Sequence, residues 1–586
     1  MELYQVLLLC SILYSVEGLK WALEYKGQGW NDYKCNVAVR HRVIEGKYRT
    51  YVHDHGHHYC AYMGIPYAKP PTGHRRFLAP QEYKDRLKRH YKHLGSMCMQ
   101  KSNGVIEGSE DCLFLNVYTP FHLKKKQKQC RKKYPVMFWI HGGAFSKGDG
   151  GWQYYGADYL LEQDVIVVTI NYRLGVFGFL TAPDLQIYGN MGLKDQRLAL
   201  QWVHQNIEKF HGDKDQITIF GQSAGAASVH YLMLDPTTTN LYTRAILQSG
   251  TAVNPWASQF KPEERFKNLT VELNKDKITK DELKSLAAKD LFEAAKKVPT
   301  SEDQRRATDP VFNPVIEDEK STNPIISQDV RKLMDQENNF PDKAILMGFN
   351  NAEGLLALER VQKDPNEIQN TLKDMERVAP RDFGIWLKPD EKEVETALKN
   401  LKEVYHINND TIWYIELMGD AWFNYGVFET LHKIVNLKTK KQKTYFYKLS
   451  DDSYSVYKEY VLTKYKDLPG VCHSDDLGYL FKMYHSSGLI SASIPSKAQL
   501  THRRMVKMWT NFAKTGDPLP KEENKDSDFT GLNWKPVEKT NIQYLDIAKD
   551  ETTMRSFKDI EEERFKLWKE LYELGKKFKQ ETNKPK

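Results

Sequence analysis

The segment that most constrains the fold of this chain runs from residue 217 to residue 228. It opens with apolar and β-branched residues that predict a buried strand, and it closes with small residues that favour a helix. Between them lies GQSAG, residues 221–225, where a glycine on either side of Ser223 permits a tight turn from strand to helix. A serine held on such a turn lies beside the free N–H groups that begin the helix.

Two more apolar runs predict strands that are buried on both faces. Residues 135–140 and 165–170 are short, continuous and bounded by polar or glycine-containing segments. Residues 193–210, between the second run and the strand before Ser223, carry apolar side chains at helical spacing. The order strand, helix, strand predicts a parallel sheet with right-handed crossovers. We therefore expect a single large α/β domain over residues 19–586.

The outer parts of the chain predict further elements of this domain. Residues 37–39 and 48–52 are short β-favouring runs that suggest antiparallel strands, and residues 445–447 and 542–545 suggest late strands. Residues 557–579 place large aromatic side chains on one face of a predicted helix, which is expected to dock on the core.

Residues 1–18 predict a secretory signal peptide. An apolar run is followed by VEG at residues 16–18, whose compact first and third residues suit cleavage after Gly18. Because no basic residue precedes the apolar run, a buried N-terminal helix remains the alternative. No other run reaches the ~20 apolar residues that a membrane helix needs, so we expect a secreted protein without stable membrane insertion. Asn268 and Asn409 begin tripeptides that can accept N-glycans in such a protein.

Charge and cysteine usage exclude several classes of function. The net charge of +8 is small for 586 residues, and basic residues are interspersed with acidic ones, whereas a nucleic-acid-binding protein concentrates them on one face. None of the seven cysteines forms a CxxC pair, which disfavours zinc or redox chemistry. The histidine-rich turn at residues 53–58 is predicted to be an exposed hairpin tip rather than a metal site. We expect neither a metal nor an organic cofactor.

The residues near the turn predict acyl-transfer chemistry. HGGAF, residues 141–145, directly follows one of the apolar runs, and its small residues let the backbone approach a substrate. The N–H groups of Gly143 and Ala144, with that of Ala224, are therefore candidates for stabilising an oxyanion. A serine hydroxyl is a weak nucleophile, so Ser223 requires a histidine base that a carboxylate orients.

The base and the acid are harder to select from the sequence. The chain has 18 histidines, of which His473 lies on a turn-prone segment late in the chain. Glu353 follows an apolar run at residues 344–346, as expected of a loop at the end of a strand. The order serine, glutamate, histidine is that of α/β-hydrolases. On the residues alone, each assignment is one candidate among several.

Motifs along nearly the whole mature chain resemble those of the type-B carboxylesterase and cholinesterase family. They are GIPYAKPP at 64–71, SEDCL at 109–113, NYRLG at 171–175, GQSAG at 221–225, EG at 353–354 and HSDDL at 473–477. AASVHYLML at 226–234 and PWA at 255–257 are most similar to the insect α-esterase branch. The resemblance implies an α/β-hydrolase fold, a large mostly parallel sheet flanked by helices.

The resemblance also assigns roles to individual residues. It implies a catalytic triad of Ser223, Glu353 and His473, and an oxyanion hole formed by Gly143, Ala144 and Ala224. It assigns Trp256 and Phe145 to the substrate pocket. It also implies a disulfide between Cys98 and Cys112 and places the Ser249 hydroxyl near the acid. A second disulfide of the family has no matching cysteines, and Cys35 with Cys60 is an alternative pair.

Three departures from the family pattern narrow the expected substrate. Ala144 replaces the commoner third glycine of the oxyanion segment, and its methyl group narrows the pocket. Gln222 replaces a frequent glutamate and so removes a negative charge beside the nucleophile. The interval from Cys98 to Cys112 lacks the tryptophan that cholinesterases use to bind a quaternary ammonium group. We therefore expect hydrolysis of uncharged small-molecule esters and disfavour cholinesterase activity.

Other functions remain open on the sequence. The fold also hosts catalytically silent binding or adhesion proteins, but all three candidate triad residues are present here. Gln222 resembles juvenile hormone esterases, which makes a hormone specialist a further alternative, and an interfacial lipase is a third. The sequence does not determine the oligomeric state.

Overall fold

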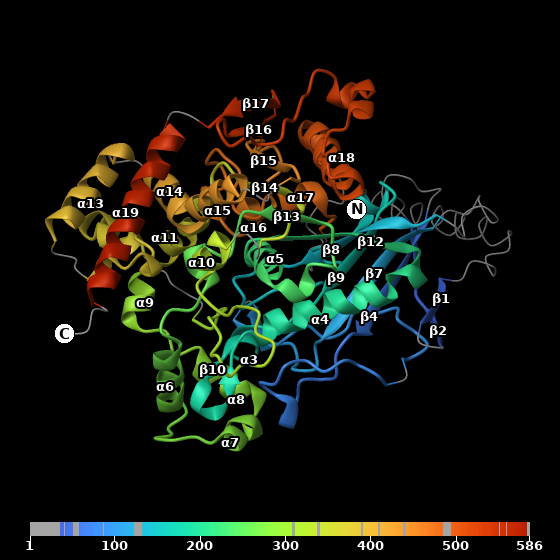
Figure 1. The fold of residues 1–586 in the computed structure, drawn as a ribbon, viewed down its shortest axis with the longest axis horizontal. Helices are drawn as coiled ribbons and strands as arrows, with labels where there is room; N and C mark the ends of the chain where they lie inside the picture. Colours follow the sequence, from blue (N-terminus) through green and yellow to red (C-terminus); the bar gives the residue numbers. More distant parts are fainter. Residues whose placement is uncertain are drawn as a thin grey trace, which may run out of the picture.

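The computed structural model describes residues 35–582, except residues 40–41, 51–57, 86, 103, 122–131, 307–310, 337–339, 388–390, 408–410, 438–440, 484–493, 550 and 558–559. The predicted signal peptide, Asn409 and most of the histidine-rich turn therefore lie outside the described residues. One sheet of eleven strands organises the domain (Figure 1). From edge to edge its strands are β17 (Thr553–Ser556), β16 (Gln543–Ile547), β15 (Thr444–Leu449), β14 (Ala344–Asn350), β13 (Arg244–Gln248), β12 (Gly212–Gln222), β8 (Tyr134–Ile140), β9 (Ile166–Ile170), β7 (Phe114–Phe121), β4 (His58–Pro66) and β3 (Lys47–Thr50).

The middle of the sheet is parallel and both of its edges are antiparallel. Every pairing from β16 across to β9 is parallel, whereas β17, β7, β4 and β3 pair antiparallel with their neighbours. All residues of β9 and β14 are buried, as expected of parallel strands covered on both faces. The predicted strands before residues 141 and 171 and before the GQSAG turn are confirmed.

Shorter pairs and helices surround this sheet. Two-stranded sheets form from β1 (Asn36–Val39) with β2 (Arg42–Glu45), β5 (Gln100–Ser102) with β6 (Val105–Glu107), and β10 (Thr181–Ala182) with β11 (Ile187–Tyr188). The helices are α2 (Asp158–Leu161), α3 (Gly175–Phe179), α4 (Met191–Asn206), α5 (Ala224–Leu234), α6 (Pro262–Glu272), α7 (Lys280–Ser285), α8 (Ala288–Ala295), α9 (Ser301–Arg305), α10 (Val330–Asp335), α11 (Leu358–Lys363), α12 (Glu367–Lys373), α13 (Lys392–Val404), α14 (Ile412–Gly419), α15 (Tyr425–Asn436), α16 (Val456–Tyr460), α17 (Leu477–Leu480), α18 (Gln499–Thr515) and α19 (Ile560–Thr582). Within the described residues no helix is both long and apolar enough to cross a membrane.

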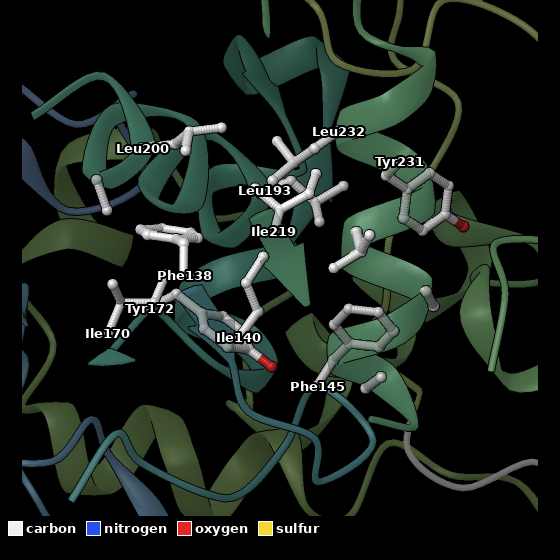
Figure 2. Packing of buried hydrophobic residues seen from close by; sticks show 14 of the residues in the cluster. Phe138, Ile140, Phe145, Ile170, Tyr172, Leu193, Leu200, Ile219, Tyr231 and Leu232 are labelled. Carbon is white, nitrogen blue, oxygen red and sulfur yellow. The ribbon is translucent and has the colours of Figure 1, made fainter. Parts of the chain in front are cut away.

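Alternating side chains of β8 enter two different cores. Phe138 and Ile140 pack into the cluster that also holds apolar residues of α4 and α5, such as Leu200 and Leu232 (Figure 2). Met137 and Trp139 point to the opposite face and join a cluster formed with α18. Because successive side chains of a strand point to opposite faces, this one apolar run holds helices on both sides of the sheet.

A third core lies at the end of the molecule opposite β1 and β2, where α13, α14 and α19 gather (Figure 1). The C-terminal helix α19 contributes Trp568, which is buried and donates a hydrogen bond from its indole nitrogen to the Tyr405 hydroxyl at 2.8 Å. Phe565 and Tyr572 of the same helix pack against this core. The predicted docking of a C-terminal helix through its aromatic face is confirmed.

The strand order reverses direction at β8 and β12. From β8 the chain passes to its neighbour β9 on one side, whereas from β12 it passes to β13 on the other. The loops that follow these two adjacent strands therefore diverge and leave room between them, which is where α/β proteins place their ligands. Ile140 stands opposite Gly221 in the register, so residues 141–145 and Ser223 leave the sheet side by side.

Two disulfides lie in the N-terminal part of the domain. Cys98 pairs with Cys112, as the resemblance implied, and Cys35 pairs with Cys60, the alternative pair of the sequence analysis. Cys472 is buried and forms no disulfide. The Cys35 bond attaches the chain before β1 to strand β4 of the main sheet.

Two histidines are buried in the fold as neutral side chains. His141 follows β8, stacks on Tyr172 with 4.4 Å between ring centroids, and is fully buried. His230 lies in α5 and is also fully buried. Burial lowers the pKa of His141 to about 4 and that of His230 to about 3. Both imidazoles therefore stay uncharged in the folded protein at neutral pH.

Replacing both Cys98 and Cys112 by alanine is expected to lower the free energy of unfolding by about 3 kcal/mol, because the unfolded chain regains the freedom of the closed loop. Urea unfolding followed by tryptophan fluorescence measures the difference. In reducing buffer the wild type and the variant are expected to unfold alike. Equal stabilities under oxidising conditions would contradict the prediction.

Buried His141 and His230 are expected to lower the free energy of unfolding as the pH drops from about 6.5 towards 4, since histidines of the unfolded chain bind protons that these two do not. The raised pKa of buried Asp476 acts in the opposite direction over this range, so the His141 contribution is isolated with a variant. The His141 contribution, present in full above about pH 6.5, amounts to about 3 kcal/mol. The glutamine of His141→Gln cannot be protonated. The free energy of unfolding of this variant should therefore change with pH less steeply than that of wild type, by the slope that corresponds to about one proton. Urea unfolding at a series of pH values tests this, and identical slopes would rule it out.

Candidate active site

Ser223 lies on the turn between β12 and α5 in a conformation that few side chains adopt. Its φ and ψ are 58° and −126°, and Ser223 is 8% exposed. Its backbone N–H donates a hydrogen bond to the Gln248 carbonyl at 2.9 Å. Gly225 makes the turn possible, because a Cβ atom at that position would lie 2.0 Å from the Ile140 carbonyl oxygen. Such strained backbone occurs where structure serves function, and here it holds the hydroxyl at the end of the sheet.

The loop after β8 passes directly against this turn. A Cβ atom on Gly142 would lie 2.7 Å from the backbone carbonyl oxygen of Gln222 and 3.1 Å from the Ser223 Cβ, so a side chain there would clash with the turn. Gly143 and Ala144 follow with φ values of 107° and 52°. The structure thus brings together the predicted oxyanion segment, Ser223 and the first N–H groups of α5, including that of Ala224. Backbone N–H groups at a helix start lack intrahelical acceptors and suit a developing negative charge.

Phe145, a predicted pocket residue, lies beneath this loop. Its side chain is fully buried in the main core and packs edge to face on Phe179, with 5.3 Å between the ring centroids (Figure 2). This placement favours packing under the oxyanion segment over contact with a substrate. A pocket role for Phe145 stays a prediction.

His473 and Glu353 lie in hydrogen-bond contact although 120 residues separate them in the chain. Their Nδ1 and Oε2 atoms are 2.7 Å apart, and the other carboxylate oxygen of Glu353 accepts the Asn350 N–H at 2.8 Å. Both side chains are buried. When Nδ1 carries the proton and donates it to the carboxylate, Nε2 keeps the lone pair that a general base needs. This tautomer follows from the hydrogen-bond partners.

The second ring nitrogen of His473 faces Gln222, the residue before Ser223. The Gln222 amide nitrogen lies 3.2 Å from His473 Nε2 and donates to the Ser474 hydroxyl at 3.1 Å. In the part of the chain that the structure describes, no hydrogen bond joins the Ser223 hydroxyl to His473. The three candidate triad residues thus converge on one turn, with a neutral carboxamide against the nitrogen that would take the serine proton.

Aromatic side chains cover the other sides of the site. Phe423 stacks on His473, with 4.1 Å between the ring centroids. The Trp256 ring lies beside Phe423, with 5.9 Å between their centroids. Half-buried Trp256 is fixed by a hydrogen bond from its indole nitrogen to the Trp422 carbonyl at 2.8 Å. Phe423 belongs to a π-helical turn between α14 and α15, an irregularity common at functional sites. Phe423 was not predicted from the sequence, because no local pattern separates it from an ordinary core aromatic.

A buried acid lies next to the Glu353 and His473 pair. The Asp476 carboxylate accepts a hydrogen bond from the Gln248 amide at 2.6 Å, and Gln248 in turn accepts one from the Trp509 indole at 3.1 Å. Burial raises the pKa of Asp476 to about 6; the Gln248 hydrogen bond opposes this rise and the nearby charge of Glu353 adds to it. These contacts fix the segment that carries His473 to β13 and α18.

Cys472 and Ser249 are the remaining chemistry-bearing groups beside the pair. Burial raises the pKa of the Cys472 thiol well above its usual range, so it stays protonated and is a poor nucleophile. Ser249 follows β13 and is fully buried, on the strand next to the one that leads to Glu353. The site therefore places the Ser223 hydroxyl near an imidazole that a carboxylate orients.

The chain is similar to known proteins along most of its length. The model of the carboxylesterase family matches residues 35–568. The juvenile hormone esterase of Tribolium castaneum is 31% identical, and the match covers 88% of this chain and 90% of that protein. A carboxylic ester hydrolase of Bombus ignitus is 32% identical, and the match covers 86% of this chain and 88% of that protein.

A solved structure is similar as well. The crystal structure of juvenile hormone esterase from Manduca sexta, with OTFP covalently attached, superposes with a TM-score of 0.78 at 26% identity. The superposition covers 92% of this chain and 100% of the Manduca sexta chain. The expected α/β-hydrolase fold is thereby confirmed. The chain belongs to the carboxylesterase family and is a carboxylic ester hydrolase.

Proposed function

We propose that this protein hydrolyses uncharged small-molecule esters through an acyl-enzyme on Ser223. The observation that carries the proposal is the 2.7 Å contact between His473 Nδ1 and Glu353, on an imidazole whose other nitrogen faces the GQSAG turn. An imidazole oriented by a carboxylate is what a serine hydroxyl needs to become a nucleophile. A silent binding protein would have no use for this buried pair.

The proposed cycle uses only side chains and backbone of this chain. His473 Nε2 takes the Ser223 proton as the serine oxygen attacks the ester carbonyl carbon, and Glu353 stabilises the imidazolium. The N–H groups of Gly143, Ala144 and Ala224 bind the oxyanion. When the tetrahedral intermediate collapses, the ester bond breaks and the alcohol leaves with the proton from His473.

Deacylation repeats these steps with water. His473 takes a proton from a water molecule, which attacks the acyl carbon, and the same N–H groups bind the second oxyanion. Collapse breaks the bond to the serine oxygen, which regains the proton from His473 as the carboxylic acid leaves. For the serine to reach Nε2 in the first step, the Gln222 carboxamide has to give up its contact with that nitrogen.

The surroundings of His473 favour uncharged substrates. Gln222 presents an amide where a carboxylate would attract a cation, and the rings of Phe423 and Trp256 offer apolar surface. Such a pocket gains binding energy from an apolar acyl or alcohol group. Juvenile hormone esterase activity is a second candidate, supported by the similarity to two proteins of that name in Tribolium castaneum and Manduca sexta.

We also infer that the protein is secreted. Its two disulfides persist in oxidising compartments, and residues 1–18 have the pattern of a signal peptide. One similar protein is a venom carboxylesterase of Apis mellifera. Asn268 is a half-buried residue of α6, and its glycosylation stays a prediction.

Removing the nucleophile or the acid is expected to abolish most activity. Ser223→Ala should lower kcat by about 10⁴-fold or more, and Glu353→Gln, which no longer holds the imidazole as a base, by about 10³- to 10⁴-fold. Initial rates with p-nitrophenyl acetate measure the loss. The control is Ser285→Ala at the exposed end of α7, which should retain wild-type kcat. A Ser223→Ala rate within tenfold of wild type would refute the proposal.

Replacing Gln222 by glutamate is expected to move the pH profile. A carboxylate beside Nε2 favours the imidazolium, which cannot act as a base, so the acidic limb of kcat/KM should shift to higher pH by about one unit or more. Hydrolysis of a choline ester should improve relative to its neutral analogue. The matched control is Gln222→Met, which adds no charge. Its acidic limb of kcat/KM should have its midpoint at a pH near that of wild type. An unshifted midpoint in the glutamate variant would contradict this reading.

A further inference from the structure

A second hollow lies far from the candidate active site, at the β3 edge of the sheet. It has a volume of about 250 Å³. Its lining residues are Lys47, Arg49, Met63, Lys92, His93, Leu94, Trp152 and Gln153. Strand β3 is separated from β12 by β8, β9, β7 and β4, and five steps at ~4.8 Å per strand place it roughly 24 Å from the strand that precedes Ser223.

Positive charge is concentrated on one wall of this pocket. Lys47 and Arg49 are two residues apart on β3, so their side chains share a face of the strand. Lys92 comes from a segment that runs beside β4, and it pairs with Glu45 at 2.5 Å. Within the described residues neither Lys47 nor Arg49 belongs to an ion pair; Asp158 acts on Arg49 only at a distance. Two cations thus line the pocket without a carboxylate in contact.

Most of the rest of the lining is apolar and aromatic. The Arg49 guanidinium lies over the Trp152 ring, 4.5 Å from its centroid. Such stacking fixes the plane of the guanidinium, and Arg49 also interacts with the Tyr59 hydroxyl, which engages part of its five N–H donors. Met63 is 2% exposed and forms an apolar base, and half-buried Leu94 adds to it. The pocket therefore combines a planar donor fork, a flexible ammonium and an apolar surface.

We propose that this pocket binds a small organic anion that carries one carboxylate or sulfate group on an apolar body. Arg49 presents the planar fork that matches two oxygens of such a group, and Lys47 adds a point charge. The apolar body would lie along Trp152 and Met63. A volume of 250 Å³ equals about eight water molecules at ~30 Å³ each, which limits the ligand to a short chain or a single ring system. An inorganic anion would contact only the basic side chains of the lining, and a neutral lipid only the apolar ones.

Isothermal titration calorimetry with octyl sulfate, octanoate, octanol and inorganic sulfate tests the proposal, with each organic ligand kept below its micelle concentration. One site per chain is expected for octyl sulfate or octanoate, and whichever binds more tightly identifies the preferred head group. Octanol and inorganic sulfate should bind at least about tenfold more weakly, and added salt should weaken the anions. Protein whose Ser223 carries a covalent organophosphate adduct should bind them as the unmodified protein does, because the adduct fills the candidate active site and leaves this pocket open.

Variants locate the binding within the pocket. Arg49→Gln with Lys47→Gln is expected to raise Kd by about tenfold or more, and Trp152→Leu by about threefold. Arg49→Lys keeps the charge and should lose less affinity than Arg49→Gln, and Lys289→Gln at an exposed position of α8 should leave Kd unchanged. Thermal unfolding of each variant shows that it is folded. Undetectable binding at millimolar ligand, octanol binding as tight as octyl sulfate, or an unchanged Kd in the double variant would each overturn the proposal.

Discussion

The parallel pairing of β8 with β12 is the interaction on which the rest of the structure depends. It sets Ile140 opposite Gly221, so that the oxyanion segment and Ser223 leave the same edge of the sheet as neighbours. Close approach is enforced from both sides, because Gly142 and Gly225 leave no room for a side chain. The pairings of β13 and β14 extend this edge and bring Gln248 and the loop of Glu353 to the same place. A shift of one residue between β8 and β12 would misplace every N–H donor of the site.

Much of the fold and part of the site could be predicted because their signals are local. Continuous apolar runs marked β8, β9 and β12, and the GQSAG turn marked the start of α5. Family resemblance added the pairing of Cys98 with Cys112, which the structure contains. Local sequence also located Gly143 and Ala144 after a strand. That expectation needed only the rule that the loop after a buried strand lies at the edge of the sheet.

The remaining features depend on contacts between distant parts of the chain. Gln222 meets His473 across 251 residues, a contact that neither its missing charge nor its resemblance to juvenile hormone esterases predicted. Phe423 stacks on His473 from a π-helical turn that no local pattern marked. Phe145 was expected in the substrate pocket from the family resemblance, and its side chain lies in the core (Figure 2), so that role stays a prediction. The direction in which a loop side chain points is set by tertiary packing, so sequence spacing does not determine it.

The central claim is that the acyl group is carried on Ser223 and that His473 with Glu353 activates this hydroxyl. The most direct measurement is peptide mass spectrometry after rapid acid quench during turnover of a slowly deacylated ester. The account predicts a mass increase equal to the acyl group on the peptide that contains Ser223, and none in the Glu353→Gln variant at the same time point. An acyl adduct on another residue, or turnover with no adduct on Ser223 under single-turnover conditions, would contradict the account.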